Sequence, residues 1–148
     1  MKKYNVAIVG ASGNVGREIL NILDFRTFPF KEIYALASSK SEGQKIIYGK
    51  DKEIVIKGLE KFDFKGVDIV FSSAGSEVSK NFIPRAVKSG AIIIDNTSCF
   101  RMHKDVPLIV PEVNLEDLKN FKKKKIIANP NCCLLYTSPS PRDLSTSR

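Results

Sequence analysis

Histidine and cysteine are scarce in this chain of 148 residues, which has one histidine, His103, and three cysteines. Cys99, Cys132 and Cys133 do not follow the spacing of a metal site, and they form no even-numbered disulfide framework. Zinc and iron sites need clusters of such ligands. We therefore expect no metal centre built from this chain alone.

Long apolar runs are also missing. No stretch approaches the roughly 20 apolar residues that span a bilayer. Met1-Lys2-Lys3 resembles the charged start of a signal peptide, but the apolar run behind it ends at Gly10. That run is shorter than the core of about 7–15 residues that secretion requires. We expect a cytoplasmic protein that makes no contact with a membrane.

Acidic residues are fewer than basic ones, 16 against 24, and the net charge is +8. The run Lys122-Lys123-Lys124-Lys125 invites a nucleic-acid interpretation, but lysines are spread along the whole chain without the aromatic interleaving of such sites. A basic balance also suits an anionic cofactor and substrate. We expect these small anions, and no nucleic acid, as partners.

Short apolar segments alternate along the chain with segments of helical periodicity. Expected strands cover 4–9, 32–37, 45–48, 53–56, 67–71, 91–94 and 126–128, the third and fourth as a hairpin, and expected helices cover 15–25, 77–88 and 115–121. Ser76 is the expected N-cap of the second helix, and Gly90 its stop. Continuous apolar strands between amphipathic helices are typical of parallel sheets. The sequence predicts an α/β fold: a doubly wound, mostly parallel sheet of the Rossmann type with helices on both faces.

The expected domain covers residues 1–132, enough for one real core. Residues 133–148 are rich in serine, threonine and proline, with little to bury, and we expect them to be disordered. They also resemble translated vector sequence joined to a truncated reading frame.

The segment from Gly10 to Gly16 follows the first strand and opens the first helix, with the spacing Gly-x-x-Gly-x-x-Gly. Gly10 suits a tight turn, Gly13 lets backbone N–H groups approach a pyrophosphate, and Gly16 allows close packing of helix and strand. A plain strand-to-helix turn needs one glycine, so three favour dinucleotide binding. After the second strand, Ala37-Ser38-Ser39-Lys40-Ser41 carries no carboxylate for a ribose 2′-hydroxyl. A lysine and serine hydroxyls suit a 2′-phosphate, which favours NADP over NAD.

The turn Asn129-Pro130-Asn131-Cys132 follows the last strand and presents a thiol. Cys132 is the predicted nucleophile, with Cys133 as its competitor, and no second histidine supplies a base. The segment Asp95-Asn96-Thr97-Ser98-Cys99-Phe100-Arg101 should reach the same sheet edge, because ligands of such sheets bind outside the carboxyl ends of the strands. Arg101 suits a phosphate or carboxylate, or else a surface salt bridge. We expect Cys99 to be a packed thiol and His103 a surface residue.

Six ordered motifs resemble the aspartate-semialdehyde dehydrogenases over residues 4–132. They are Gly10-Ala11-Ser12-Gly13-Asn14-Val15-Gly16, Ala37-Ser38-Ser39-Lys40-Ser41, Ser73-Ala74-Gly75, Asp95-Asn96-Thr97-Ser98-Cys99-Phe100-Arg101, Val110-Pro111-Glu112-Val113-Asn114 and Asn129-Pro130-Asn131-Cys132.

The resemblance implies NADPH-dependent reduction of L-aspartyl 4-phosphate to L-aspartate 4-semialdehyde with release of phosphate, a step toward lysine, threonine and methionine. It implies a homodimer for the full-length protein. The implied cofactor-binding residues are Gly10, Ser12, Gly13, Asn14 and Val15 at the pyrophosphate, Ser38, Lys40 and Ser41 at the 2′-phosphate, and Ala74 and Gly75 at the nicotinamide. The implied substrate-binding residues are Arg101, Asn131 and Asn96, and Cys132 attacks the acyl phosphate.

The chain departs from this family directly after Cys132, where a second domain with the base histidine should follow. We therefore predict that the 148-residue chain is inactive. Two alternatives stay open: a reductase of N-acetyl-glutamyl phosphate, whose thiol turn usually has glycine where this chain has Asn131, and a non-catalytic NADP-binding module.

Overall fold

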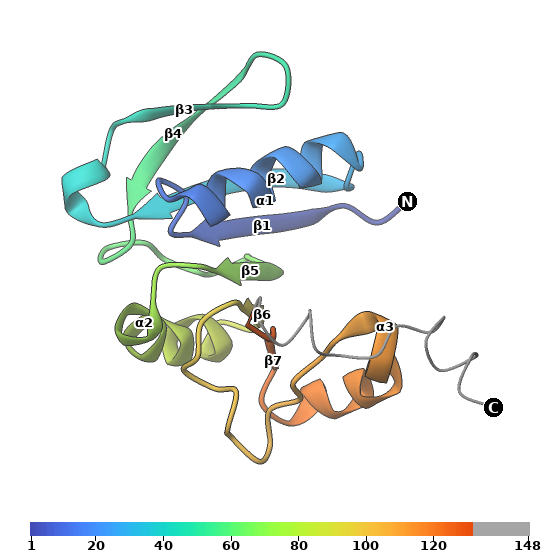
Figure 1. Cartoon of the computed structure of the whole chain (residues 1–148). Coiled ribbons are helices and arrows are strands. Elements are labelled where there is room, and N and C mark those ends of the chain that lie inside the picture. The colour runs from blue at the N-terminus through green and yellow to red at the C-terminus, as the bar shows by residue number, and fades with distance from the viewer. Residues whose placement is uncertain (132–148) are drawn as a thin grey trace.

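The computed structural model describes residues 1–131. Cys132, Cys133 and the rest of the predicted tail lie outside the described residues. Within residues 1–131, seven strands form one sheet in the order β3-β4-β2-β1-β5-β6-β7 (Figure 1). The strands are β1 (Tyr4–Val9), β2 (Phe30–Ala37), β3 (Lys45–Tyr48), β4 (Lys52–Gly58), β5 (Ile69–Ser72), β6 (Ile92–Asp95) and β7 (Ile126–Ala128). The helices are α1 (Asn14–Phe25), α2 (Ser76–Lys88) and α3 (Pro111–Asn114), with 3₁₀ turns η1 (Ser39–Ser41) and η2 (Leu115–Lys123).

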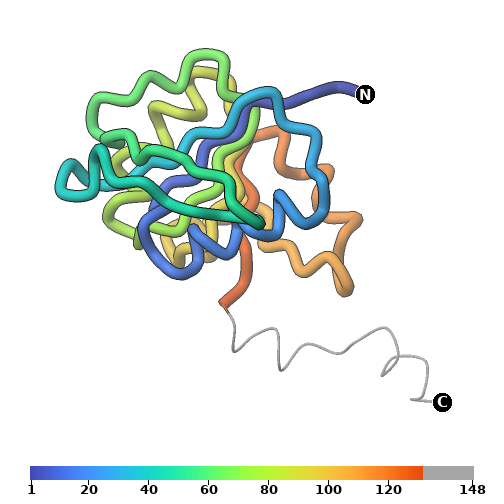
Figure 2. The backbone as a smooth tube through the Cα atoms, turned by 90° about the horizontal axis from the view of Figure 1, so that it is seen from above, coloured from blue at the N-terminus to red at the C-terminus, as the bar shows by residue number. Residues whose placement is uncertain are grey.

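All neighbouring strands pair in parallel except β3 and β4, which form the expected hairpin. Parallel pairing sends every carboxyl end of the main sheet to one edge. The N-terminus and residue 131 therefore lie at opposite edges of the sheet (Figure 2). The predicted doubly wound fold is confirmed.

Two hydrophobic clusters lie on the two faces of the sheet, and β1 divides its side chains between them. Val6 and Ile8 pack in the cluster that contains Leu20 of α1. Ala7 and Val9 pack in the cluster that contains Phe82 of α2. This alternation follows from the two-residue period of a strand, and all four side chains are fully buried because a helix covers each face.

The α1 face is less covered over β5, β6 and β7. Ile69 and Phe71 of β5, and Ile94 of β6, are only half-buried, whereas Val70 and Ile93, on the α2 face, are fully buried. Helix α1 reaches β1, β2 and the hairpin, and exposes part of its own apolar surface on the side of β5. The apolar runs of β5 and β6 thus predict strands correctly without implying equal burial on both faces.

The hairpin is fixed to α1 by polar contacts. Lys52 Nζ lies 2.5 Å from Asp24 Oδ1, and the Gly49 N–H donates to Asn21 Oδ1 at 3.0 Å. Beyond the hairpin, β4 continues to Gly58 and pairs in parallel with β2. The expected strand 53–56 was therefore too short, because β4 has a second partner in the main sheet.

Two expectations for the helices are wrong. The N-cap of α2 is Gly75 instead of Ser76, and its φ of +93° and ψ of 159° suit glycine. Ser76 is already helical, and its Oγ lies 2.8 Å from Ser98 Oγ. The expected helix 115–121 is the 3₁₀ segment η2, in which no residue is buried. Helices gain most of their stability from a packed face, which this segment lacks.

Within residues 1–131, no helix is long and apolar enough to cross a membrane. In the same residues, no three His, Cys, Asp or Glu side chains gather so that they could hold a metal ion.

Candidate functional site

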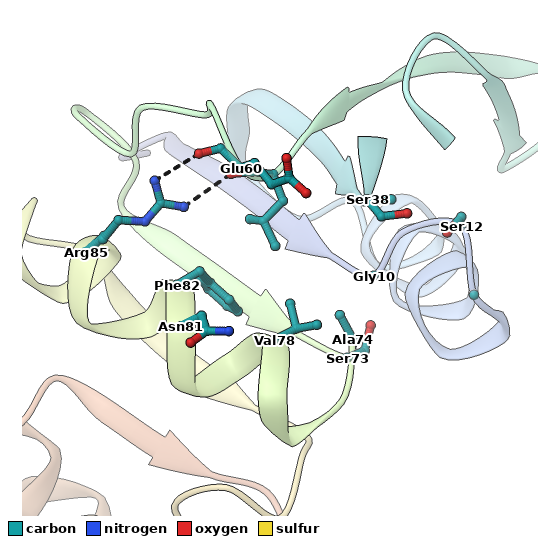
Figure 3. Close-up of a pocket in the computed structure, with 13 residues that line it drawn as sticks. Gly10, Ser12, Ser38, Glu60, Ser73, Ala74, Val78, Asn81, Phe82 and Arg85 are labelled. Carbon is teal, nitrogen blue, oxygen red and sulfur yellow. Dashed lines mark hydrogen bonds between the residues drawn. The ribbon is translucent and has the colours of Figure 1, made fainter. Parts of the chain in front are cut away.

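A cavity of about 650 Å³ opens at the carboxyl edge of the sheet, beside the glycine-rich loop (Figure 3). Loops after β1, β2, β4 and β5 meet here with one side of α2. The lining residues are Gly10, Ser12, Gly13, Ala37, Ser38, Leu59, Glu60, Ser73, Ala74, Val78, Asn81, Phe82 and Arg85. Ligands of open parallel sheets bind in this position, and about 650 Å³ is a usual size for a small-molecule site.

The glycine-rich loop is packed too closely for larger residues. Gly10 has φ +87°, and a Cβ added to it would lie 2.9 Å from Ala74 N and Ser73 Oγ. A Cβ on Gly16 would overlap the Gly10 carbonyl oxygen and Ala11 Cα. The turn therefore requires glycine at Gly10 for conformation and contact, and at Gly16 for the close approach of α1 to the loop.

The amino end of α1 faces this loop without a neutralising group. Gly13 is its N-cap, no side chain caps it, and its first turn has no acidic residue. The first N–H groups of a helix have no partner within the helix and carry a partial positive charge. The residues present therefore fit a pyrophosphate, which would accept hydrogen bonds from these groups.

The opposite wall of the cavity comes from α2. Val78, Asn81, Phe82 and Arg85 have the spacing i, i+3, i+4 and i+7, which places them along one side of the helix (Figure 3). Arg85 Nη1 donates to the Glu60 carbonyl, and Nη2 donates to the Leu59 carbonyl, both at 3.2 Å. These bonds tie the loop after β4 to α2. Reasoning from the sequence missed this wall, although the periodicity of residues 77–88 carries the signal.

Half of the predicted cofactor-binding residues line this cavity: Gly10, Ser12, Gly13, Ser38 and Ala74. The others are not among the lining residues, but they directly follow these loops in α1, in η1 and at the N-cap of α2: Asn14, Val15, Lys40, Ser41 and Gly75. Lys40 lies in η1, two residues after Ser38, and it is exposed. Its side chain therefore reaches solvent beside the cavity. Gly75 is the N-cap of α2, directly after Ala74.

The predicted substrate-binding residues Asn96 and Arg101 lie together after β6. Arg101 Nη2 donates to the Asn96 carbonyl at 3.0 Å, and Arg101 Nε donates to the Asn129 carbonyl at 2.9 Å. The Asn129 side-chain amide donates to Asn96 Oδ1 at 2.7 Å. Within residues 1–131, Arg101 makes these bonds to main-chain carbonyls and forms no salt bridge. Sequence reasoning missed Asn129, which was visible only as part of the turn before Cys132.

A buried carboxylate anchors the loop that carries these groups. Asp95 is fully buried, and its side chain accepts from the Thr97 N–H at 3.1 Å, Thr97 Oγ1 at 3.0 Å and Ser79 Oγ at 3.3 Å. Ser79 Oγ also lies 2.7 Å from Ser72 Oγ. The hydroxyl groups of Ser79 on α2 and of Thr97 after β6 thus bond this carboxylate directly, and Ser72 of β5 holds Ser79 in place. Buried carboxylates require such partners, so the network fixes the start of the loop.

The remaining predicted residues lie as follows. Cys99 is half-buried, and burial raises the pKa of its thiol, with a further increase from Asp95. His103 is exposed, as expected for a surface residue. Asn131 is exposed at the end of the described chain, one residue before Cys132. Residues 129–131 therefore leave the sheet at the edge where Asn96 and Arg101 lie.

The parallel sheet, the glycine-rich turn between β1 and α1, and the cavity at the carboxyl edge define a nucleotide-binding domain of the Rossmann type. Residues 5–121 match the family described as "Semialdehyde dehydrogenase, NAD binding domain". The chain belongs to this family.

Named relatives and solved structures agree with this assignment. An aspartate-semialdehyde dehydrogenase of Rickettsia bellii is 55% identical over 131 residues, which are 88% of this chain and 38% of the relative. The structure of aspartate semialdehyde dehydrogenase II from Vibrio cholerae, complexed with ASA, has a TM-score of 0.87 and 43% identity, and the match covers 92% of this chain and 44% of that one.

A third similar protein is the aspartate semialdehyde dehydrogenase with NADP from Candida albicans, with a TM-score of 0.74 and 27% identity; the match covers 89% of this chain and 44% of that one. The chain spans about 38% of the length of its curated relatives.

Proposed function

We propose that the protein to which residues 1–132 belong reduces L-aspartyl 4-phosphate to L-aspartate 4-semialdehyde, with NADPH as hydride donor and release of phosphate. The observation that carries the proposal is the shared sheet edge. The nucleotide-sized cavity, the Asn96–Arg101 pair and the chain leading to Cys132 all follow carboxyl ends of neighbouring strands. The family and the relatives support the same reaction.

The cofactor is NADP. Ser12, Asn14 and Val15 hold the pyrophosphate through backbone N–H groups at the start of α1. Gly10 and Gly13 shape this turn, because their own N–H groups donate to the carbonyls of Leu36 and Gly10. Ser38, Lys40 and Ser41 bind the 2′-phosphate, and Ala74 and Gly75 line the nicotinamide. The lysine acts as a mobile point charge, which suits its exposed place in η1. NADPH supplies a hydride when it is bound.

The chemistry on the protein is covalent. The Cys132 thiolate attacks the acyl carbon, the bond from that carbon to the phosphate oxygen breaks, and phosphate leaves with its electron pair. A bound NADPH would supply the hydride that reduces the thioester carbonyl, and the Cys132 thiolate would then leave to release the aldehyde. Arg101 and Asn96 hold the phosphate, and Asn131 orients the acyl group.

The test uses the full-length protein in the reverse direction, with aspartate semialdehyde, phosphate and NADP, and follows NADPH by absorbance. Cys132→Ala should abolish NADPH formation, and Cys133→Ala should largely preserve it. Full activity of Cys132→Ala would overturn the proposal. N-acetylglutamate semialdehyde should be a poor substrate, and a preference for it would favour the N-acetyl-glutamyl-phosphate reductases instead.

The 148-residue chain alone should bind NADPH without turnover, because it carries the cavity but spans only 38% of the length of a relative such as the Rickettsia bellii protein. NADPH fluorescence titration measures the first property, and the absorbance assay the second. Binding without any activity of the full-length protein would indicate a non-catalytic NADP-binding module.

A further inference from the structure

We propose that Asn129 is a positioning residue, which fixes Asn96 and Arg101 as one binding site for phosphate. The inference rests on the proposed function and deepens it, because it assigns a role to a residue that the sequence motifs name only as part of the turn Asn129-Pro130-Asn131-Cys132. It starts from the three polar groups of Asn129, each of which contacts a different part of the site.

Asn129 is the first residue after β7. Its N–H donates to the Asp95 carbonyl at 2.8 Å and extends the pairing of β6 and β7 by one step. Its side-chain Nδ2 donates to Asn96 Oδ1 at 2.7 Å, and its carbonyl accepts from Arg101 Nε at 2.9 Å. Asn129 therefore holds Asn96 and Arg101, the two residues proposed to bind phosphate, while the sheet holds its own backbone.

The contact with Asn96 determines which end of that amide is left for a ligand. Asn96 Oδ1 accepts from Asn129, so the amide group that remains is Nδ2, a donor. Phosphate oxygens accept hydrogen bonds, so a donor is the useful end. An Asn96 side chain released from Asn129 could present either end, and half of its orientations would oppose the anion.

The contact with Arg101 fixes the guanidinium in the same way. Nε and Nη2 donate to the carbonyls of Asn129 and Asn96, which sets the plane of the group. Among the described residues no acceptor is bonded to Nη1, so this nitrogen is left for phosphate. Holding a flexible side chain in its binding geometry before the ligand arrives lowers the entropy cost of binding.

The surroundings of the pair are rigid on one side and open on the other. On the buried side, the hydrogen bonds of Asp95 with Thr97 and Ser79 fix the start of the loop. Asn96 and Asn129 also line a second cavity of about 340 Å³, which leaves them accessible beside Val15 of α1. Glu18 also lines this cavity and Arg101 does not, so the cavity opens the Asn96 end of the pair, while the half-buried Arg101 side chain lies beside it.

The experiment measures binding of inorganic phosphate by the 148-residue chain labelled with ¹⁵N-arginine. Nuclear magnetic resonance detects the Nε–H of each arginine, and Arg101→Lys identifies the Arg101 signal by its loss. The Arg101 signal should shift on addition of phosphate. Asn129→Leu nearly keeps the volume of the side chain and removes its amide. It should raise the phosphate midpoint, the phosphate concentration that gives half of the signal shift, about fivefold to tenfold. Asn129→Gln retains an amide and should have a smaller effect.

Asn120→Ala is the matched control, because Asn120 is exposed on η2 away from this pair, and it should bind phosphate as the unchanged chain does. Equal phosphate midpoints for Asn129→Leu and the unchanged chain would overturn the proposal, as would an Arg101 signal that does not respond to phosphate. Should Asn129→Leu fail to fold, the Asn129→Gln midpoint decides. Loss of NADPH binding with an intact phosphate response would count against the proposed function alone.

Discussion

Gly10 lies against Ala74, so that the loop after β1 and the loop after β5 are in direct contact: a Cβ on Gly10 would lie 2.9 Å from Ala74 N. Ser73 strengthens the contact, since its N–H and its Oγ both donate to the Val9 carbonyl at 2.9 Å. The two loops therefore form one continuous wall of the larger cavity. A ligand that binds the glycine turn is placed beside Ala74 by the same contact.

Gly10→Ala should destabilise the chain by about 1–3 kcal/mol and abolish NADPH binding, because alanine is strained at φ +87° and its Cβ would displace the Ser73–Ala74 loop. Urea unfolding and NADPH fluorescence measure the two effects. Gly43→Ala is the control: its φ is +84°, with no atom within 4 Å of the added Cβ, so it tests strain alone. Equal NADPH binding by both variants would contradict the role of this contact.

Arg85→Ala should weaken NADPH binding roughly tenfold, because the loop after β4 would lose two hydrogen bonds to α2 and one wall of the cavity would loosen. Arg85→Lys should recover part of the affinity, since lysine can still donate to one carbonyl. Lys88→Ala, on the last turn of the same helix, removes a comparable charge outside the cavity and should bind normally. Fluorescence titration distinguishes the three; unchanged affinity of Arg85→Ala would refute this role.

Lys40→Ala should reduce the affinity for NADPH roughly tenfold and leave that for NADH nearly unchanged, because the proposed partner of the Lys40 ammonium is the 2′-phosphate, which only NADPH carries. The ratio of the two dissociation constants is the informative quantity, since a general change of the fold would alter both. Lys50→Ala, in the turn between β3 and β4, removes the same charge elsewhere. A proportional loss of both cofactors would place the 2′-phosphate away from Lys40.

Much of the fold could be predicted because local signals agree with it. The apolar runs of β1, β2 and β7 lie where the sequence pattern puts them, and the spacing of Gly10, Gly13 and Gly16 predicts the turn into α1. Backbone conformation was harder. Gly75 takes the N-cap of α2 from Ser76 because its positive φ suits the turn after β5, and sequence pattern does not encode that angle.

Half of the candidate site escaped prediction for a related reason. Leu59, Glu60 and Arg85 are far apart in the chain and meet only when β4 joins β2 and α2 crosses behind β5. Asn129 was seen as a turn former, whereas its partners Asn96 and Arg101 depend on the β6–β7 register. Short motifs report what lies next to a residue in sequence, and these contacts are long-range.

Ile93→Ala should destabilise the chain by about 2–5 kcal/mol. Ile93 of β6 is fully buried in the hydrophobic cluster on the α2 face, and removing its side-chain atoms leaves a cavity. Ile22→Ala should cost less than about 1 kcal/mol, since Ile22 is 44% exposed on α1. Urea unfolding of both variants compares the two faces of the molecule. Similar losses would mean that the α1 face is as closely packed as the α2 face.

Cys99 should react with iodoacetamide at a higher pH than an ordinary cysteine needs for the same reaction. Burial and the Asp95 charge both raise the pKa of its thiol, and Lys80 opposes them only in part. The variant Cys132→Ser/Cys133→Ser isolates this thiol. Asp95→Asn in that background should lower the midpoint of alkylation, while Asp105→Asn should not change it.

The folded state holds the thiol proton more tightly than the unfolded state. The stability that this provides is therefore complete below the unfolded pKa of about 8.5 and disappears as the pH rises through the folded pKa. A midpoint at or below that of free cysteine would refute the burial of this thiol.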